Sequence, residues 1–184
     1  MKKVLLLTAL IIITGCATLN YYKYNIEHIE DEFDGYVIDR MHGNYIPGGG
    51  AIPTNSLLFN AQRFINKEGD KHYHFYVQYH DIEWLFINEG EKLVLLVDGE
   101  RVGFTGKGSF SHREVLQGYA STAVKETALF GTTPEALVKI ANAKSVKIKL
   151  IGTTRDIQRE LSQEHITNFK KFVDEYVETV TAYN

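Results

Sequence analysis

The chain has 184 residues, with 20 Lys or Arg against 23 Asp or Glu, and its formal net charge is −3 at pH 7. A chain of this length is expected to form one domain. It has no basic tract, so its charge does not support nucleic-acid binding, and we expect no nucleic-acid partner.

The first 15 residues have the layout of a secretory signal peptide. A positive end, MKK, precedes ten almost wholly apolar residues, VLLLTALIII, and the small residues Thr14 and Gly15 follow. The apolar stretch is too short to remain as a membrane-spanning helix, which needs about 20 residues. We therefore predict that residues 1–15 are removed on export.

The run Ile13-Thr14-Gly15-Cys16 resembles the bacterial lipobox, in which an aliphatic residue, a small or β-branched residue and Gly or Ala precede Cys. This resemblance to bacterial lipoproteins covers residues 1–17. It implies that the Cys16 thiol carries a diacylglyceryl group and that cleavage occurs before Cys16. Two or more acyl chains hold a protein stably at a membrane. The alternative is an ordinary secretory signal with a cysteine there by chance.

Lipidation would use the single cysteine of the chain, so no thiol would remain for a disulfide, a thiolate metal site or a nucleophile. Removal of residues 1–15 takes away two lysines and no acid, which leaves 18 basic and 23 acidic residues and a net charge of −5. The resemblance implies a protein anchored at the cell membrane. In a host with two membranes it implies the outer one, because Ala17 replaces the Asp that is typical of inner-membrane retention.

Residues 16–24 are predicted to be the lipidated cysteine and a short tether, so that the domain lies close to the membrane. The tether ends in the sequence YYKY, Tyr21 to Tyr24. Its tyrosines either sit at the level of the lipid headgroups, where amphipathic rings are favoured, or begin the first strand. Residues 25–184 are predicted to form one globular domain.

The first part of this domain is predicted to be rich in strands. Strands are expected at Gly35–Tyr45 and Ser56–Ile65, with a loop at Ile46–Pro53, because three glycines between two prolines cannot hold a regular ladder. Lys71–Tyr79 alternates strongly between polar and apolar residues. The polar turn Asn66–Asp70 before it predicts a β-hairpin.

The middle of the chain contains a second hairpin signal. Lys92–Val97 is typical of a buried strand, and Asp98-Gly99 after it predicts a tight turn with a returning strand at Arg101–Phe104. Gly103–His112 is predicted to be a Gly/Ser-rich loop. Glu114–Phe130 is predicted to be a long strand interrupted by a bulge.

Two helices are predicted near the C-terminus. The first begins at Thr133, with Pro134 at its first position, and continues to Ala143. Ser145–Ile151 alternates as a half-buried strand, and Arg155–Leu161 is expected to pair back with it.

The last helix begins after Ser162 as its N-cap, and Leu161 and Ile166 are placed to form a hydrophobic staple. One apolar stripe along this helix contains Ile166, Phe169, Val173, Tyr176, Val177 and Val180. Together these patterns predict an α+β fold, an antiparallel β-sheet or sandwich of five to eight strands with two helices near the C-terminus. The segments KLVLLVDGERV and TPEALVKIANAKSVKIKLIG resemble those of bacterial envelope lipoproteins with no assigned activity.

The strand KHYHFYVQYHDIEW carries the sharpest candidate for chemistry. Alternation along a strand predicts one face formed by His72, His74, Tyr76, Gln78 and His80, opposite Tyr73, Phe75, Val77 and Tyr79. His72 and His74 are candidate ligands of zinc or copper. The alternative is a solvent-facing polar face over an aromatic core.

A third metal ligand is hard to find on the same strand, because His80 lies roughly 20 Å from His74 along an extended chain. It would come from His42 or His112 elsewhere, or from Asp81 or Glu83 if the chain turns.

The loop GFTGKGSFSH is not a phosphate-binding loop, because Gly108 stands where Ser or Thr must follow Gly-Lys. Ser109, Ser111 and His112 lack the G-x-S-x-G pattern of a nucleophile elbow. We predict a hairpin connection without catalytic residues.

Acidic residues cluster before the first predicted strand, at Glu27, Glu30, Asp31, Glu32 and Asp34. They predict a solvated approach segment, with a weak divalent-cation site or a glycosidase pair as alternatives. Trp84 and Phe86 are predicted to be core residues, and a ligand platform is the alternative.

These observations predict a membrane-anchored module, not an enzyme, that binds a partner or acts as a scaffold in the envelope, without a cofactor. Its binding surfaces would be the GGG and GKGS loops. Its partners would be the membrane, through Cys16, and an envelope protein. The alternative is a metal-binding or hydrolytic enzyme built on His72 and His74.

Overall fold

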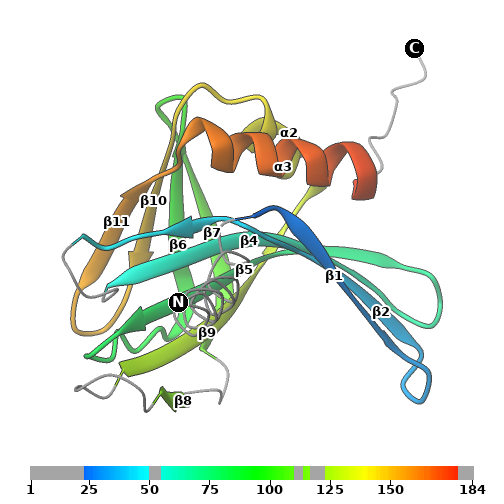
Figure 1. Cartoon of the computed structure of the whole chain (residues 1–184), viewed down its shortest axis with the longest axis horizontal. Helices are drawn as coiled ribbons and strands as arrows, with labels where there is room; N and C mark the ends of the chain where they lie inside the picture. The colour runs from blue at the N-terminus through cyan, green and yellow to red at the C-terminus, as the bar shows by residue number, and fades with distance from the viewer. Residues whose placement is uncertain (1–22, 50–54, 110–113, 117–122, 178–184) are drawn as a thin grey trace, which may run out of the picture.

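The structure is a computed structural model, and it describes residues 23–49, 55–109, 114–116 and 123–177. The predicted signal peptide, Cys16 and nearly all of the predicted tether lie outside these residues. Within them, eleven strands form one antiparallel sheet, with two helices towards the C-terminal end (Figure 1). The α+β class and the antiparallel sheet are confirmed, whereas the prediction of five to eight strands is too low.

The strands are β1 (Asn25–Asp31), β2 (Tyr36–His42), β3 (Tyr45–Ile46), β4 (Ser56–Ile65), β5 (Lys71–Asp81), β6 (Glu89–Val97), β7 (Glu100–Ser109), β8 (Glu114–Leu116), β9 (Ala123–Thr132), β10 (Val146–Ile151) and β11 (Asp156–Glu160). The helices are α2 (Pro134–Ala141) and α3 (Gln163–Tyr176). The strand order is β1-β2-β4-β5-β9-β7-β6-β10-β11, with β3 beside β4 and β8 beside β9.

The sheet is sharply bent. Figure 1 shows β6, β7 and β10 rising steeply from the part formed by β1, β2, β4 and β5, with both helices inside the bend. The strand register shifts between Glu91 and Leu93 in β6 and between Gly106 and Ser109 in β7, and such bulges bend a sheet. We call the face towards the helices the inner face and the opposite one the outer face.

The core lies between the inner face and the helices, and aromatic rings dominate it. The Phe59 ring centroid lies 5.0 Å from that of Phe75 and 5.4 Å from that of Phe169 on α3. Phe104 meets Phe75 edge to face at 4.9 Å. The apolar stripe predicted for the last helix is therefore confirmed for its described residues, and Val180 lies outside them.

Both ends of α3 are held by side chains. The Ser162 hydroxyl accepts a hydrogen bond from the His165 amide, and the His165 ring accepts one from the Ser162 amide, which completes a capping box. At the other end, Arg63 and Tyr73 of the sheet donate to the carbonyl oxygen of Tyr176. A cation is favourable there because the last carbonyls of a helix have no partner within it.

The predicted hairpins are confirmed. β4 has the bounds that its sequence predicted, and β5 pairs with it from Ser56 opposite His80 to Ile65 opposite Lys71. The turn between β6 and β7 consists of Asp98 and Gly99, which have φ of 50° and 89°. Positive φ at both positions matches the right-handed twist of a hairpin.

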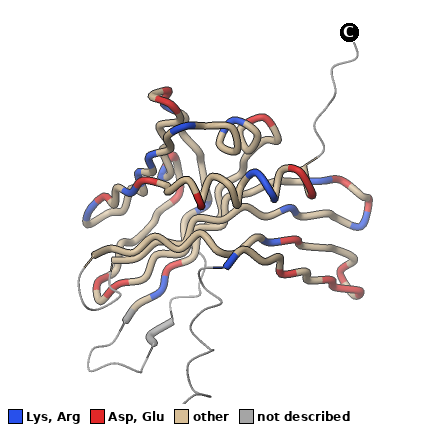
Figure 2. The backbone as a smooth tube through the Cα atoms, turned by 45° about the horizontal axis from the view of Figure 1, so that its top comes forward, with Lys and Arg blue, Asp and Glu red and all other residues tan. Residues whose placement is uncertain are grey.

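The predicted acidic approach segment is wrong in conformation, because residues 25–31 form the strand β1. All seven of its residues pair with β2. Charged residues suit an edge strand, since they discourage pairing with other chains. Figure 2 shows acidic residues gathered at the turn after β1, where the Asp31 carboxylate accepts hydrogen bonds from the Phe33 and Asp34 amides.

The predicted strand Gly35–Tyr45 is divided into β2 and β3 at Gly43. Gly43 has φ of 109°, and a Cβ there would lie 2.8 Å from the Tyr24 backbone nitrogen. Tyr24 itself packs against the core, and its ring lies 5.1 Å from the Lys171 ammonium. The last residue of the predicted tether thus packs on the domain one position before β1, whereas Tyr21 and Tyr22 lie outside the described residues.

Two further predictions in the middle of the chain are wrong. The segment predicted as a loop from Gly103 instead continues β7 as far as Ser109. Gly106 makes this possible because it has no side chain: a Cβ on Gly106 would lie 2.7 Å from the Leu129 carbonyl oxygen of β9. The predicted long strand with a bulge is two strands, since β8 pairs antiparallel with β9. No helix in the described ranges is long and apolar enough to cross a membrane.

Candidate functional site

Polar side chains from four strands meet on the outer face of the sheet. The strand register places Glu27 of β1 opposite Arg40 of β2, Arg40 opposite Gln62 of β4, and Gln62 opposite His74 of β5. Residues that face one another across neighbouring strands point to the same side of a sheet. They therefore form a polar row that runs across the strands.

Hydrogen bonds join this row to the residues beside it. Arg40 donates from Nε to Gln62 Oε1 at 3.0 Å and from Nη1 to Glu27 Oε2 at 3.1 Å. The His42 Nε2 atom also lies 3.1 Å from Glu27 Oε2. The Arg40 guanidinium lies 4.1 Å from the centre of the Tyr76 ring, within the range of a cation–π contact. Two of the three guanidinium nitrogens are thus held in place by neighbours.

A groove of about 490 Å³ opens beside these residues. It is lined by Asn25, Glu27, Arg40, His42, Gly43, Leu58, Tyr76, Gln78 and Lys125. We call it the outer-face groove. Its volume falls within the usual range for small-ligand sites, and its lining combines a few apolar groups with several polar ones.

Buried polar groups lie in the groove lining, at Gln78, and on the strands that carry it, at Asn60 and Thr127. Gln78 donates to the Tyr76 hydroxyl at 2.5 Å and to the Thr127 hydroxyl at 3.2 Å. Asn60 lies opposite Tyr76 and is fully buried, and its carbonyl oxygen accepts from the Asn44 amide. The Asn60 amide nitrogen has no partner among the described residues. A buried donor without a partner is unusual and is most simply explained by an ordered water molecule.

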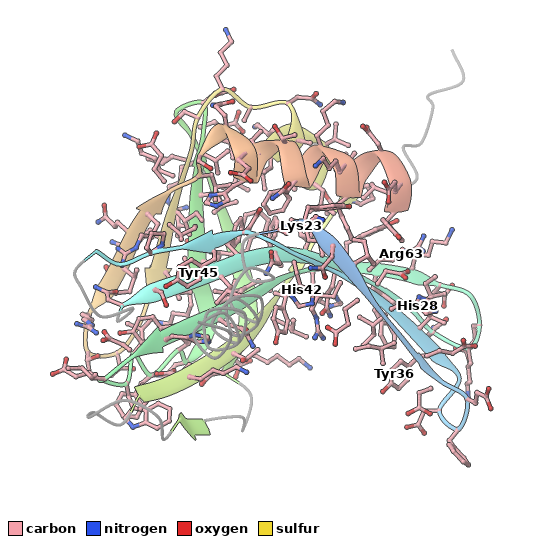
Figure 3. The ribbon with its side chains drawn as sticks, viewed as in Figure 1. Lys23, His28, Tyr36, His42, Tyr45 and Arg63 are labelled. Carbon is pink, nitrogen blue, oxygen red and sulfur yellow. The ribbon has the colours of Figure 1, made fainter. Side chains whose placement is uncertain are left out.

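The chain enters the domain beside this groove. Figure 3 shows Lys23 and His42 close together, whereas Tyr36 lies at the far end of β2. In the register, Asn25 faces His42, so the first residue of β1 forms part of the groove wall.

The face predicted for β5 is confirmed. Tyr73, Phe75, Val77 and Tyr79 are buried in the core, while His72, His74, Tyr76, Gln78 and His80 belong to the outer face. The His72 ring lies 6.3 Å from the Phe64 ring, and burial, followed by the charge of His72, lowers the pKa of His74.

The described residues contain no group of three or more His, Cys, Asp or Glu placed to hold a metal ion. His42 is paired with Glu27, and His112 lies outside the described residues. The metal site at His72 and His74 stays a prediction, and the part of the chain that the structure describes adds no third ligand to it.

Asp81 and Glu83 do not lie beside the candidate metal ligands His72 and His74. Asp81 is buried on the inner face, where it accepts from the Tyr79 hydroxyl at 2.5 Å and pairs with Arg155. Glu83 is exposed and lies 3.7 Å from Arg155.

The remaining candidates do not form a site together. Ser109 lies at the end of β7, whereas Ser111 and His112 lie outside the described residues. Trp84 and Phe86 pack against each other, with ring centroids 6.1 Å apart and both rings half-buried.

His80 makes the stability of the fold depend on pH. Burial, together with the charge of Lys125, lowers the pKa of His80 from 6.5 to about 4. At a pH between 4 and 6.5, the unfolded chain binds a proton at His80 that the folded chain does not bind. The free energy of unfolding should therefore fall by about 2–3 kcal/mol as the pH is lowered from 6.5 to 4.

Urea unfolding at pH 7, 6, 5 and 4 measures this loss. His80→Gln should lose less stability than the parent over this range. An unchanged slope in His80→Gln would contradict the assignment.

Sequence reasoning missed Arg40, Gln62 and the pairing of Glu27. These residues are distant in the sequence and meet only because β1 pairs with β2 and β2 with β4. No local pattern reports that pairing. Comparison of the chain with protein-family models, curated proteins and solved structures gives no match.

Proposed function

We propose that the protein is an exported, lipid-anchored binding module whose ligand site is the outer-face groove. The lipobox at Cys16 supports export and anchoring. The observation that carries the binding role is the groove itself, where Glu27, Arg40 and His42 are held together by hydrogen bonds on a sheet. Side chains fixed on strands lose little freedom when a ligand binds, which favours affinity.

The sequence analysis placed the binding surfaces at the GGG and GKGS loops, and we now propose the outer-face groove in their place. The whole GKGS segment lies within β7, and residues 50–54, which include the last glycine of the GGG loop, lie outside the described ranges.

The length of the tether supports a role at the membrane. Lys23 lies seven positions after Cys16, and a fully extended chain spans at most about 3.5 Å per residue, or roughly 25 Å in all. The groove begins two residues later, at Asn25. A lipid at Cys16 would therefore keep the groove within a few nanometres of the membrane surface.

Photo-crosslinking in intact cells tests the binding role. A photo-crosslinking amino acid in place of His42, at the wall of the groove, is expected to give a discrete adduct. The same amino acid in place of Lys170, which is exposed on α3, serves as the control. Absence of an adduct at position 42, or equal adducts at both positions, would contradict the proposal.

A further inference from the structure

We infer that the outer-face groove binds a neutral carbohydrate, an oligosaccharide with free hydroxyl groups. This inference rests on the proposed function, because it names the class of ligand for the same groove. It follows from three properties of the described residues: mixed donors and acceptors, a carboxylate in the wall, and a neighbouring strip of aromatic rings.

The groove offers both donors and acceptors. Gln78 and Arg40 supply N–H donors to the lining, and Arg40 is oriented by its bonds to Glu27 and Gln62. Glu27 uses one carboxylate oxygen, Oε2, for both Arg40 and His42. A sugar hydroxyl donates one hydrogen bond and accepts others, so it matches a lining of both kinds. Hydrogen bonds from hydroxyls to charged groups are also the stronger ones.

The carboxylate of Glu27 argues against an anionic ligand. Its side chain is 43% exposed, and its carboxylate accepts a hydrogen bond from the Arg40 guanidinium, which it pairs as a counter-ion. A phosphate or carboxylate ligand would meet a like charge in the groove wall, and like charges in close contact are unfavourable. A neutral polar ligand avoids this cost.

An aromatic strip lies next to the polar row on the same face. The Tyr36 and Phe64 ring centroids are 5.5 Å apart, and Phe64 is 6.3 Å from the His72 ring. Phe64 and His72 are two residues along their strands from Gln62 and His74, a step of about 7 Å. The electron-rich faces of aromatic rings attract the C–H groups of a sugar ring. An oligosaccharide could therefore lie with one unit in the groove and the next on the strip.

Titration calorimetry on the full mature chain, in a detergent without a sugar headgroup, tests the inference. The probes are cellotriose, maltotriose, the trimer of N-acetylglucosamine, inorganic phosphate and glycerol 3-phosphate. We expect at least one trisaccharide to bind and both phosphates to fail. Glu27→Gln should weaken the trisaccharide at least tenfold, because it loses a charged acceptor and releases Arg40 and His42.

The matched control is Glu30→Gln, on the same strand but on the inner face, which should bind as the parent does. Equal thermal unfolding of both variants and the parent would show that the fold is kept. Binding of a phosphate alone, strengthened in Glu27→Gln, would overturn the inference and leave the proposed binding module standing. Failure of every trisaccharide would also overturn it, and failure of the crosslink at His42 as well would overturn both.

Discussion

Replacing Glu126 by leucine is expected to lower the free energy of unfolding by about 3–5 kcal/mol. Glu126 of β9 is fully buried, and its carboxylate accepts hydrogen bonds from three consecutive backbone amides. Oε1 accepts from Leu85 at 2.5 Å and from Phe86 at 2.9 Å, and Oε2 accepts from Ile87 at 3.1 Å. Leucine would leave all three donors without a partner, at a cost of about 1–3 kcal/mol each before relaxation.

Urea unfolding at pH 7 measures this effect. Glu126→Gln keeps one acceptor oxygen and should lose less stability than the leucine variant. Glu89→Ala removes an exposed carboxylate on β6 and should change the free energy of unfolding by no more than about 0.5 kcal/mol. A loss below about 1 kcal/mol in Glu126→Leu would show that these amides are satisfied without the carboxylate.

Replacing Cys16 by serine is expected to release the protein from the membrane almost completely. Serine cannot accept the thioether-linked lipid that the lipobox predicts, and the domain has a net charge of −5 once residues 1–15 are removed, with no basic tract to hold it at an anionic surface. Cell fractionation with a high-pH wash and labelling with a radioactive fatty acid measure the change.

Ala17→Ser, one residue further along, is the matched control and should stay in the membrane fraction with its label. If Cys16→Ser sediments with membranes as the parent does, acyl chains at this position are not what anchors the protein.

The sequence predicted correctly the elements whose conformation is set by residues close to one another in the chain. The period of α3, its cap at Ser162 and the strict alternation of β10 are each set by neighbours within a few residues. The Asp98-Gly99 turn was predicted for the same reason, since few residues adopt positive φ without cost.

The elements that were missed depend on contacts between distant segments. β1 has few apolar residues, and its pairing with β2 makes it a strand. The glycines of β7 indicate a loop in isolation, but Gly106 permits close packing on Phe130. The strand propensity of the local sequence does not predict β1 or the end of β7, because tertiary packing determines both.

Most of the candidate site also depends on contacts between segments that are distant in the sequence. The alternation of β5 correctly placed His74 and Tyr76 on one face, and this is the part of the site that a single strand determines. Arg40 and Glu27 reach that face from two other strands, and the carboxylate of Glu126 finds its amides about 40 residues away. Only the sheet order brings these groups together.

The intact mass of the mature protein, extracted from membranes with detergent, shows whether Cys16 is the lipid anchor. We expect a chain that begins at Cys16, lacks residues 1–15 and carries the added mass of two or three acyl chains on that residue. A chain that begins elsewhere, or one with a free Cys16 thiol and no lipid mass, would contradict it.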